Sequence, residues 1–161
     1  MFNKAIICGL IILVVAVAIN PINATDYEGY TVNVNGFDFN MINGYEQDSE
    51  MIIDEDNTDI NGDQVHLYLV SFYGDDGVIT ISTKTRNSEP YAGGDALTAG
   101  NNNHDMISTV QNISGKTGKL IEDKSLGDST YSFWYVEDGV EIIIDADSVD
   151  KIEYCIGNTN Q

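Results

Sequence analysis

Carboxylate and carboxamide side chains are concentrated in residues 54–63, which read DEDNTDINGD. Oxygen ligands of this kind bind calcium when they occupy positions 1, 3 and 5 of a loop that has glycine at position 6 and a carboxylate at position 12. Counted from Asp59, the next two ligand positions are Asn61 and Asp63, but glutamine stands at position 6 and valine at position 12. The spacing therefore argues against a high-affinity calcium loop.

Two interpretations of this segment stay open. Asp59, Asn61 and Asp63 could hold a divalent ion weakly in a calcium-rich exterior, or Asn61-Gly62 could be a turn between two strands with the acids in water. The second is favoured, because Asn-Gly is a strong turn signal and residues 65–70 have the composition of a strand. We therefore assign no metal ligand and no cofactor, and keep weak Ca²⁺ binding as a hypothesis.

No other group of residues has catalytic spacing. His66 and His104 are isolated from each other and lack the spacing of a zinc site. There is no G-x-S-x-G nucleophile signature, and Gly115-Lys-Thr117 lacks the earlier glycine of a phosphate-binding loop. The 26 acids allow some carboxylate pair in any fold. We predict a non-enzymatic protein with no catalytic residue, and a carboxylate-dependent hydrolase of a surface glycan as the alternative.

Aromatic residues are concentrated in residues 130–137 (TYSFWYVE). Strand alternation places Tyr131, Phe133 and Tyr135 on one face and Trp134 on the other. Burial of both faces is expected, because apolar strand faces usually form the core. Exposure of the Trp134 face would instead favour a surface that stacks on sugars or another polymer.

The elements that position these residues are mainly strands. Alternating or β-branched runs predict strands, Asn-Gly and Asp-Gly predict hairpin turns, and apolar residues at three- and four-residue spacing predict helices. About seven strands are expected, at 30–34, 37–41, 65–73, 78–85, 118–123, 130–137 and 140–146, with a further short one at 51–53, a loop at 86–103, and helices at 104–113 and 149–156.

This order of elements predicts an α+β fold, a mainly antiparallel sheet of about seven strands with two short helices packed on it. Neither an internal repeat nor a Pro- or Ser-rich linker divides the chain, so residues 25–161 are expected to form a single domain.

The first residues have the features of an export signal. Lys4 precedes the apolar run Ala5–Ile19, which is followed by Asn20-Pro21 and Ala24. A basic lead, a short apolar core and a small residue after a helix breaker describe a secretory signal peptide, here residues 1–24. The run is short for a membrane span, which needs about 20 apolar residues. We expect a secreted or cell-envelope protein, or one with an N-terminal anchor if the signal is not cleaved.

Charge limits the partners. The chain has 7 basic and 26 acidic residues, a formal net charge of −19. Nucleic acids and anionic membranes are bound through Lys and Arg, so both are unsuitable partners. Cationic partners and envelope polymers fit better.

Cys8 would leave with the signal, and Cys155 would then have no disulfide partner and is expected to be buried. Asn112-Ile113-Ser114 is a glycosylation sequon.

One segment resembles a known group of proteins. Residues 34–45 (VNGFDFNMINGY) are similar to the opening of small exported proteins of methanogenic archaea, which typically read F-N-I-P-x-G-[FY]; Ile42 stands where that pattern has proline. The run YSFWYVEDGVEIIIDA, followed by a terminal helix, matches the same layout. More distantly, the order of elements resembles the PsbP- and Mog1-like α/β sandwich. The resemblance implies a fold and an exported location, and no catalytic residue. The sequence thus predicts an exported, acidic binding or interaction module whose ligand it does not identify.

Overall fold

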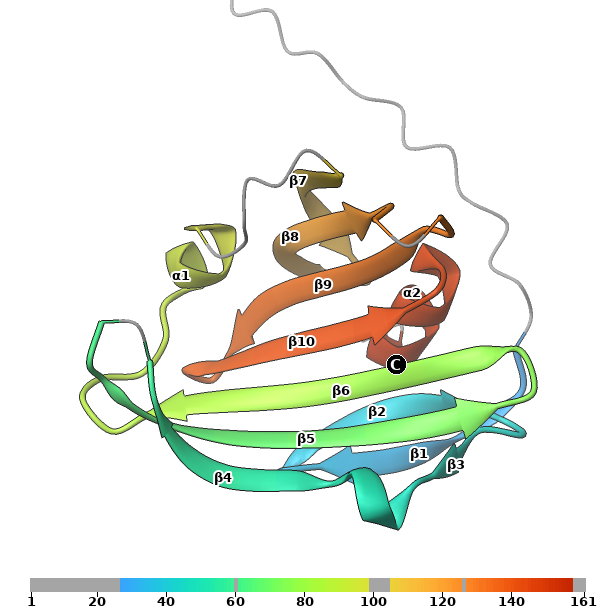
Figure 1. Ribbon diagram of the computed structural model, residues 1–161, viewed down its shortest axis with the longest axis horizontal. Helices are drawn as coiled ribbons and strands as arrows, with labels where there is room; N and C mark the ends of the chain where they lie inside the picture. The colour runs from blue at the N-terminus through green and yellow to red at the C-terminus, as the bar shows by residue number, and fades with distance from the viewer. Residues whose placement is uncertain (1–26, 60, 99–104, 126, 158–161) are drawn as a thin grey trace, which may run out of the picture.

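The computed structural model describes residues 27–59, 61–98, 105–125 and 127–157 (Figure 1). The expected signal peptide at 1–24 and His104 lie outside this part of the chain. Within it, no helix is both long and apolar enough to cross a membrane.

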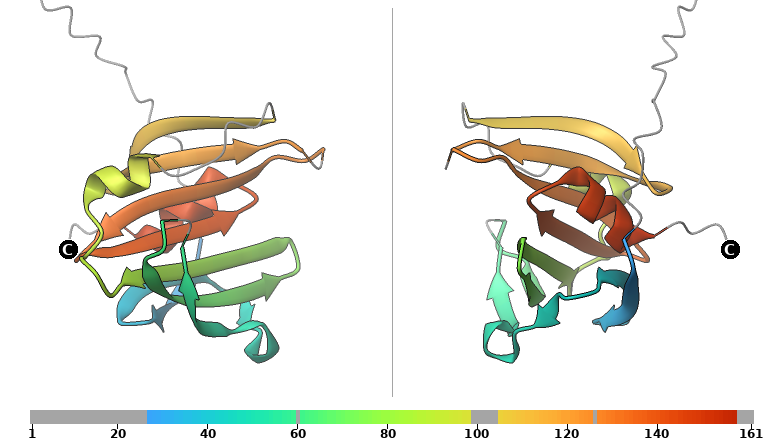
Figure 2. Two further views of the ribbon diagram at one scale, coloured as in Figure 1. Left: turned by 60° about the vertical axis from the view of Figure 1, so that its left-hand side comes forward. Right: turned by 90° about the vertical axis from the view of Figure 1, so that its right-hand side faces the viewer.

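Most of the described chain belongs to one antiparallel sheet of eight strands. Its strands follow the order β3-β5-β6-β10-β9-β8-β7, and β4 also pairs with β5. A separate hairpin, β1–β2, lies against it (Figure 2). The bounds are β1 Gly29–Val34, β2 Phe37–Ile42, β3 Glu46–Gln47, β4 Ile53–Thr58, β5 Gln64–Gly74, β6 Gly77–Arg86, β7 Met106–Ile113, β8 Lys116–Asp123, β9 Thr130–Glu137 and β10 Val140–Ala146.

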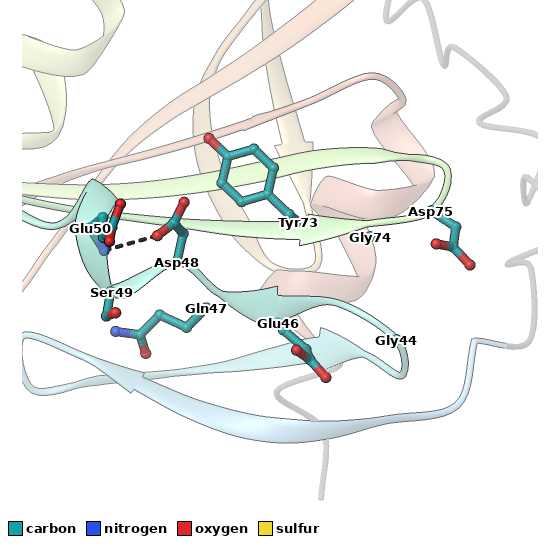
Figure 3. A pocket seen from close by; sticks show the side chains of 9 residues that line it. All are labelled: Gly44, Glu46, Gln47, Asp48, Ser49, Glu50, Tyr73, Gly74 and Asp75. Atoms are coloured by element: carbon teal, nitrogen blue, oxygen red, sulfur yellow. Dashed lines mark hydrogen bonds between the residues drawn. The ribbon is translucent and has the colours of Figure 1, made fainter.

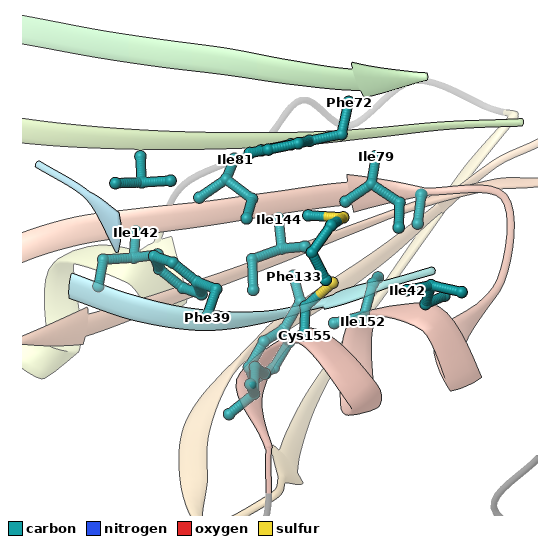
Figure 4. Close-up of a cluster of buried hydrophobic side chains, with 14 of the residues drawn as sticks. Phe39, Ile42, Phe72, Ile79, Ile81, Phe133, Ile142, Ile144, Ile152 and Cys155 are labelled. Carbon is teal, nitrogen blue, oxygen red and sulfur yellow. The ribbon is translucent and has the colours of Figure 1, made fainter. Parts of the chain in front are cut away.

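The core lies between one face of the sheet, the β1–β2 hairpin and the helix α2 (Val149–Ile156) (Figure 4). Alternate residues of the strands point into it, as the pleat requires. The hairpin turns at Asn35-Gly36, where both residues have positive φ (50° and 92°), as the type I′ turn demands. The most deeply buried members of the core come from seven elements: Val34, Met41, Phe72, Ile79, Ile81, Phe133, Ile142, Ile144, Ile152 and Cys155.

The terminal helix forms as its sequence predicts. Ser148 is the N-cap and its hydroxyl accepts from the Lys151 N–H, while Gly157 ends the helix with a φ of 74°. Ile152 and Cys155 are fully buried. The expected burial of Cys155 is confirmed.

The helix expected at 104–113 is wrong, because residues 106–113 form strand β7. The same apolar residues that repeat at helical spacing also fit a strand, and the β-branched Ile107, Thr109, Val110 and Ile113 favour it. Ser114-Gly115 turns the chain into β8 with positive φ at both residues (47° and 83°), which makes β7–β8 a hairpin.

Three further boundaries differ from expectation. The short strand expected at 51–53 is a 3-10 turn, Ser49–Met51, followed by the longer strand β4. The expected loop at 86–103 contains a short helix, α1 (Gly93–Thr98). The main sheet has eight strands instead of about seven. The expected fold class, α+β with an antiparallel sheet and two short helices, is confirmed.

The second face of the sheet, opposite the hairpin and α2, is here called the open face. Register places Trp134 beside Ile143, Ile143 beside Ser82 and Ser82 beside Leu69, so these four residues form one row across β9, β10, β6 and β5. Helix α1 packs against β8 and β9 near one end. The rest of this face carries a groove of about 880 Å³.

Candidate functional site

A groove of about 880 Å³ lies on the open face. Its lining comes from the end of β4, the β4–β5 turn, the strands β5, β6, β10, β9 and β8, the start of β7, and the segment around α1. Apolar side chains (Val65, Leu67, Met106, Ile121 and Trp134) alternate with hydroxyls and amides (Asn57, Thr58, Asn61, Thr98, Thr130 and Ser132). This mixture suits a ligand that has both apolar surface and many hydrogen-bonding groups.

Two cations line the groove, and each contacts an acid. Lys84 Nζ lies 3.0 Å from Glu141 Oε1, whose side chain is only 5% exposed, and the two residues are directly paired across β6 and β10. Arg86 Nη2 lies 2.9 Å from Asp95 Oδ2. The Arg86 guanidinium carbon also lies 3.7 Å from the centre of the Tyr91 ring. These contacts hold both cations in place and neutralise part of their charge.

Two residues that line the groove each have a buried donor without a partner. Trp134 Nε1 and Arg86 Nε are the only buried side-chain nitrogen or oxygen atoms, within the described residues, that lack a hydrogen bond. Leaving a buried donor unsatisfied costs about 1–3 kcal/mol. Both residues line the same groove, but the two nitrogen atoms themselves have almost no exposed surface, so a ligand oxygen could accept from them only if the side chains shift on binding.

Acids beside the groove have different proton affinities. Hydrogen bonds from the Ser125 backbone and side chain lower the pKa of Asp123, which lines the groove. Burial raises the pKa of Asp145, and the hydroxyl of Ser132, another lining residue, donates to its carboxylate. Asp145 itself is not part of the lining. The pair of acids that a hydrolase would need, one with raised and one with lowered pKa in one cleft, is thus met only in part.

The segment DEDNTDINGD divides between a strand and a turn. Residues 54–58 belong to β4, and Asn61-Gly62 turns the chain into β5 with Gly62 at a φ of 89°. The Asp59 carboxylate accepts from the backbone N–H of Asn61 (2.8 Å) and Asp63 (3.0 Å). Burial acts to raise the pKa of Asp59, but these hydrogen bonds outweigh it and lower the pKa. The favoured interpretation, a turn between strands, is confirmed.

Of the three residues considered for calcium, Asp59 is the one whose side chain has a defined role in the turn. Its Oδ1 accepts from two backbone amides. Among the described residues, no group of three His, Cys, Asp or Glu side chains is arranged to hold a metal ion. Asp59 and Asn61 contribute instead to one end of the groove. Weak calcium binding stays a prediction to be tested.

His66 lies between two acids on the strand next to the edge. Its Nδ1 is 3.0 Å from Asp56 Oδ1 and its Nε2 is 3.3 Å from Asp54 Oδ1. Both acids belong to β4: Asp56 is directly opposite His66, and Asp54 lies two residues before Asp56. The contact is exposed, and it ties β4 to β5.

A second, shallow cavity of about 670 Å³ is strongly acidic (Figure 3). It lies where β3 joins the 3-10 turn, beside the β5–β6 turn. Its lining includes four acids (Glu46, Asp48, Glu50 and Asp75) and the exposed ring of Tyr73, and no Lys or Arg. Asp48 accepts from the backbone N–H of Glu50, which stabilises the turn. Such a cluster of acids would attract cations in general, and it defines no specific ligand.

A buried lysine that no sequence pattern indicates connects three parts of the fold. Lys151 Nζ donates to the Tyr45 hydroxyl (2.8 Å), Asp147 Oδ2 (2.9 Å) and the Asp76 carbonyl (3.2 Å). Tyr45 also donates to Asp76 Oδ1 (2.8 Å). The network connects α2, the β5–β6 turn and the segment after β2. It lies on the core side, away from the groove, and its role is structural.

Comparisons with family models, with curated proteins and with solved structures find no match to this chain. The resemblance to small exported archaeal proteins therefore stays a prediction. The interpretation of the site depends on its own geometry.

Strand alternation predicts the face of Trp134 correctly, but the expected burial of both faces is wrong. Phe133 and Tyr135 are buried in the core, whereas Trp134 is partly exposed and lines the groove. Asp59 and Asn61 also line it, as part of the β4–β5 turn. Lys84 and Arg86 were not singled out. Their signal was available in residues 78–86 (VITISTKTR), where strand alternation puts both of these scarce cations on the face opposite Ile79 and Ile81.

Proposed function

We propose that the protein is an exported binding module and that the groove on the open face binds a neutral, hydroxyl-rich ligand, best represented by a glycan. The observation that carries the proposal is the lining of the groove, in which the partly exposed Trp134 and other apolar side chains lie among hydroxyls and amides. Sugar hydroxyls and ring oxygens can hydrogen-bond to these polar groups. The apolar wall fits the C–H faces of a sugar ring, as aromatic residues commonly do.

Charge supports a neutral ligand. The lining contains Lys84 and Arg86 as cations, and both already contact acids. A chain of net charge −19 would repel polyanions such as nucleic acids, which proteins bind through Lys and Arg. A polycation would be drawn to the acidic cavity beside Tyr73 instead of the groove.

The paired acids favour binding over catalysis. Glu141 and Asp95 are held by cations, and Asp59 is held by backbone amides. A general acid needs a raised pKa and direct access to the bond that it cleaves. Asp145 has the raised pKa but does not line the groove. Hydrolysis of a surface glycan is therefore the alternative function, and an assay for released reducing ends distinguishes it from binding.

The chain offers a built-in probe, because Trp134 is its single tryptophan. Tryptophan emission of the chain from residue 25 should change on titration with soluble mannan, dextran or β-glucan, and at least one of them should retard the protein in a native affinity gel. Trp134→Phe keeps an aromatic ring and removes the N–H donor. We expect it to weaken retardation about fivefold, since the smaller ring and the lost N–H together remove about 1 kcal/mol, and 1.4 kcal/mol is tenfold.

Tyr73→Phe is the matched control, since it alters an aromatic residue outside the groove. Equal retardation of Trp134→Phe and the unaltered protein would locate binding elsewhere. No response to any of the three polysaccharides would refute the glycan assignment. Release of reducing ends during incubation would identify a hydrolase instead.

A further inference from the structure

The two edges of the eight-stranded sheet differ in charge. At one edge, β4 carries Asp54, Glu55 and Asp56 within six residues. An added antiparallel strand with the same sequence would bring like charges close together, which protects this edge from self-association. At the other edge, β7 reads MISTVQNI and contains no charged residue and no proline. Charge and proline are common devices that blunt an edge, and β7 uses neither.

The side chains of β7 are unusually exposed for their type. Six of its eight residues are exposed. Val110 (61%) and Ile107 (51%) are the two most exposed large apolar side chains of the described residues. Within the same part of the chain, β7 pairs with β8 and with no other strand. Its outer side therefore presents a backbone edge together with apolar side chains.

β7 and the first part of β8 form the least acidic stretch of the sequence, and the acids Glu122 and Asp123 lie opposite only the first two residues of β7. Residues 106–121 contain no Asp or Glu, the longest such stretch after residue 24, and Lys116, Lys119 and Lys124 follow β7 in the sequence. A cationic partner would be attracted to the acidic surfaces instead. A second molecule that is itself strongly acidic is repelled least here, because like charges repel over a distance of about 8–10 Å at moderate salt. This distribution favours a second copy of the chain as the occupant.

We propose that β7 pairs antiparallel with β7 of a second copy across a two-fold axis, so that the sheet continues from one subunit into the other. Such a contact is isologous and requires the surface to be self-complementary. An uncharged strand meets this requirement, because no antiparallel register places two like charges opposite each other. Pairing would cover Val110 on the open-face side of the strand and Ile107 on its other side.

The contact has a characteristic response to salt. A single pair of strands makes a small interface, so the dimer belongs to the weak class. The rest of each subunit is acidic, and the two subunits repel each other. Salt screens this repulsion, so association should strengthen as the salt concentration rises. A dimer held by opposite charges would show the reverse.

Sedimentation velocity tests the proposal on the chain from residue 25, made in a host that does not glycosylate Asn112. This chain retains the whole core, whose buried residues lie between Val34 and Ile156. We expect a monomer–dimer equilibrium at concentrations up to about 1 mM, shifted toward dimer by salt. Val110→Lys should weaken association at least tenfold, because it places lysines close together at the paired edge. Val78→Lys is the matched control, with the same substitution at an exposed apolar position (39%) on the interior strand β6.

Hydrogen exchange locates the contact. Amides of Met106–Ile113 should exchange more slowly as the protein concentration rises, and those of β4 should not change. A protein that stays monomeric over the whole range would overturn the proposal. A dimer that Val110→Lys leaves intact, or one that salt dissociates, would do the same, since either result assigns association to another surface.

Discussion

Replacing Lys151 with methionine should destabilise the protein far more than its position in a helix suggests. The Lys151 side chain is 5% exposed, and its ammonium group makes three hydrogen bonds, to Tyr45, Asp147 and Asp76. Removing one partner of a fully buried ion pair costs about 3–5 kcal/mol. Here the acid partners Asp76 and Asp147 are 68% and 42% exposed, so water can solvate them in the variant.

We therefore expect a loss of about 2–3 kcal/mol at neutral pH, within the range of hydrogen bonds to charged groups. Lys116→Met is the matched control. It makes the same change in size and charge, in a pair with Glu137 that is partly solvated (23% and 32% exposed), and should cost at most about 1 kcal/mol. The free energy of unfolding is measured by urea denaturation of both variants and the parent.

The cost should depend on pH in a defined direction. Hydrogen bonds from Tyr45 and Lys151 lower the pKa of Asp76 below its ordinary value of 3.8. A carboxyl whose folded pKa is lowered contributes stability above its unfolded pKa and loses it as the pH falls through the folded value. The difference between Lys151→Met and the parent should therefore shrink below about pH 3.8. Burial acts to lower the pKa of Lys151, but its hydrogen bonds outweigh this and raise the pKa above 10.5, so its own contribution persists throughout the neutral range. A cost equal to that of Lys116→Met, or one that is the same at about pH 3 and about pH 7, would refute this account of the network.

Two further predictions concern the cysteine and the acidic turn. Burial raises the pKa of Cys155 to about 12, so its thiol should not react with a disulfide reagent at about pH 8 until urea unfolds the protein; rapid reaction of the native protein would contradict its burial. Millimolar Ca²⁺ and Mg²⁺ at matched ionic strength should raise the melting temperature by the same small amount in the parent and in a variant with Asp59→Asn and Asp63→Asn, through screening of charge. A calcium-selective rise that the variant loses would instead make this turn a metal site.

Local patterns predicted the elements whose signals agreed with one another. In β1–β2 and β9–β10, alternation, β-branched or aromatic content and an Asn-Gly or Asp-Gly turn all favoured a hairpin, and both hairpins are present. In residues 106–113 the signals conflicted, because the same apolar residues fit a helical face and a strand. The tertiary structure decided the outcome, since β7 forms by pairing with β8 and Ile113 reaches the core.

The groove was less accessible to prediction, because its residues come together through strand order. Alternation alone shows that Trp134 and Phe133 face opposite ways. Nothing local shows that β6 pairs with β10, and this pairing is what places Lys84 opposite Glu141. The same applies to Arg86, which meets Asp95 through the helix α1 that the sequence did not indicate. Residue types can be read from the sequence, whereas the acids that contact Lys84 and Arg86 depend on which elements lie side by side in the fold.

The distribution of the few cations connects the groove with the β7 edge. A chain with 26 acids and 7 bases stays soluble through repulsion, but the same repulsion opposes any contact with another acidic molecule. Lys84 and Arg86 are used inside the groove, where they neutralise acids that would otherwise face a ligand. Lys116, Lys119 and Lys124 lie in and just after β8, next to the uncharged edge. The two sites should therefore respond differently to salt: binding of a neutral glycan in the groove should change little, while pairing of two acidic subunits at β7 should strengthen. A salt titration of both activities in one preparation distinguishes the two sites without any mutation.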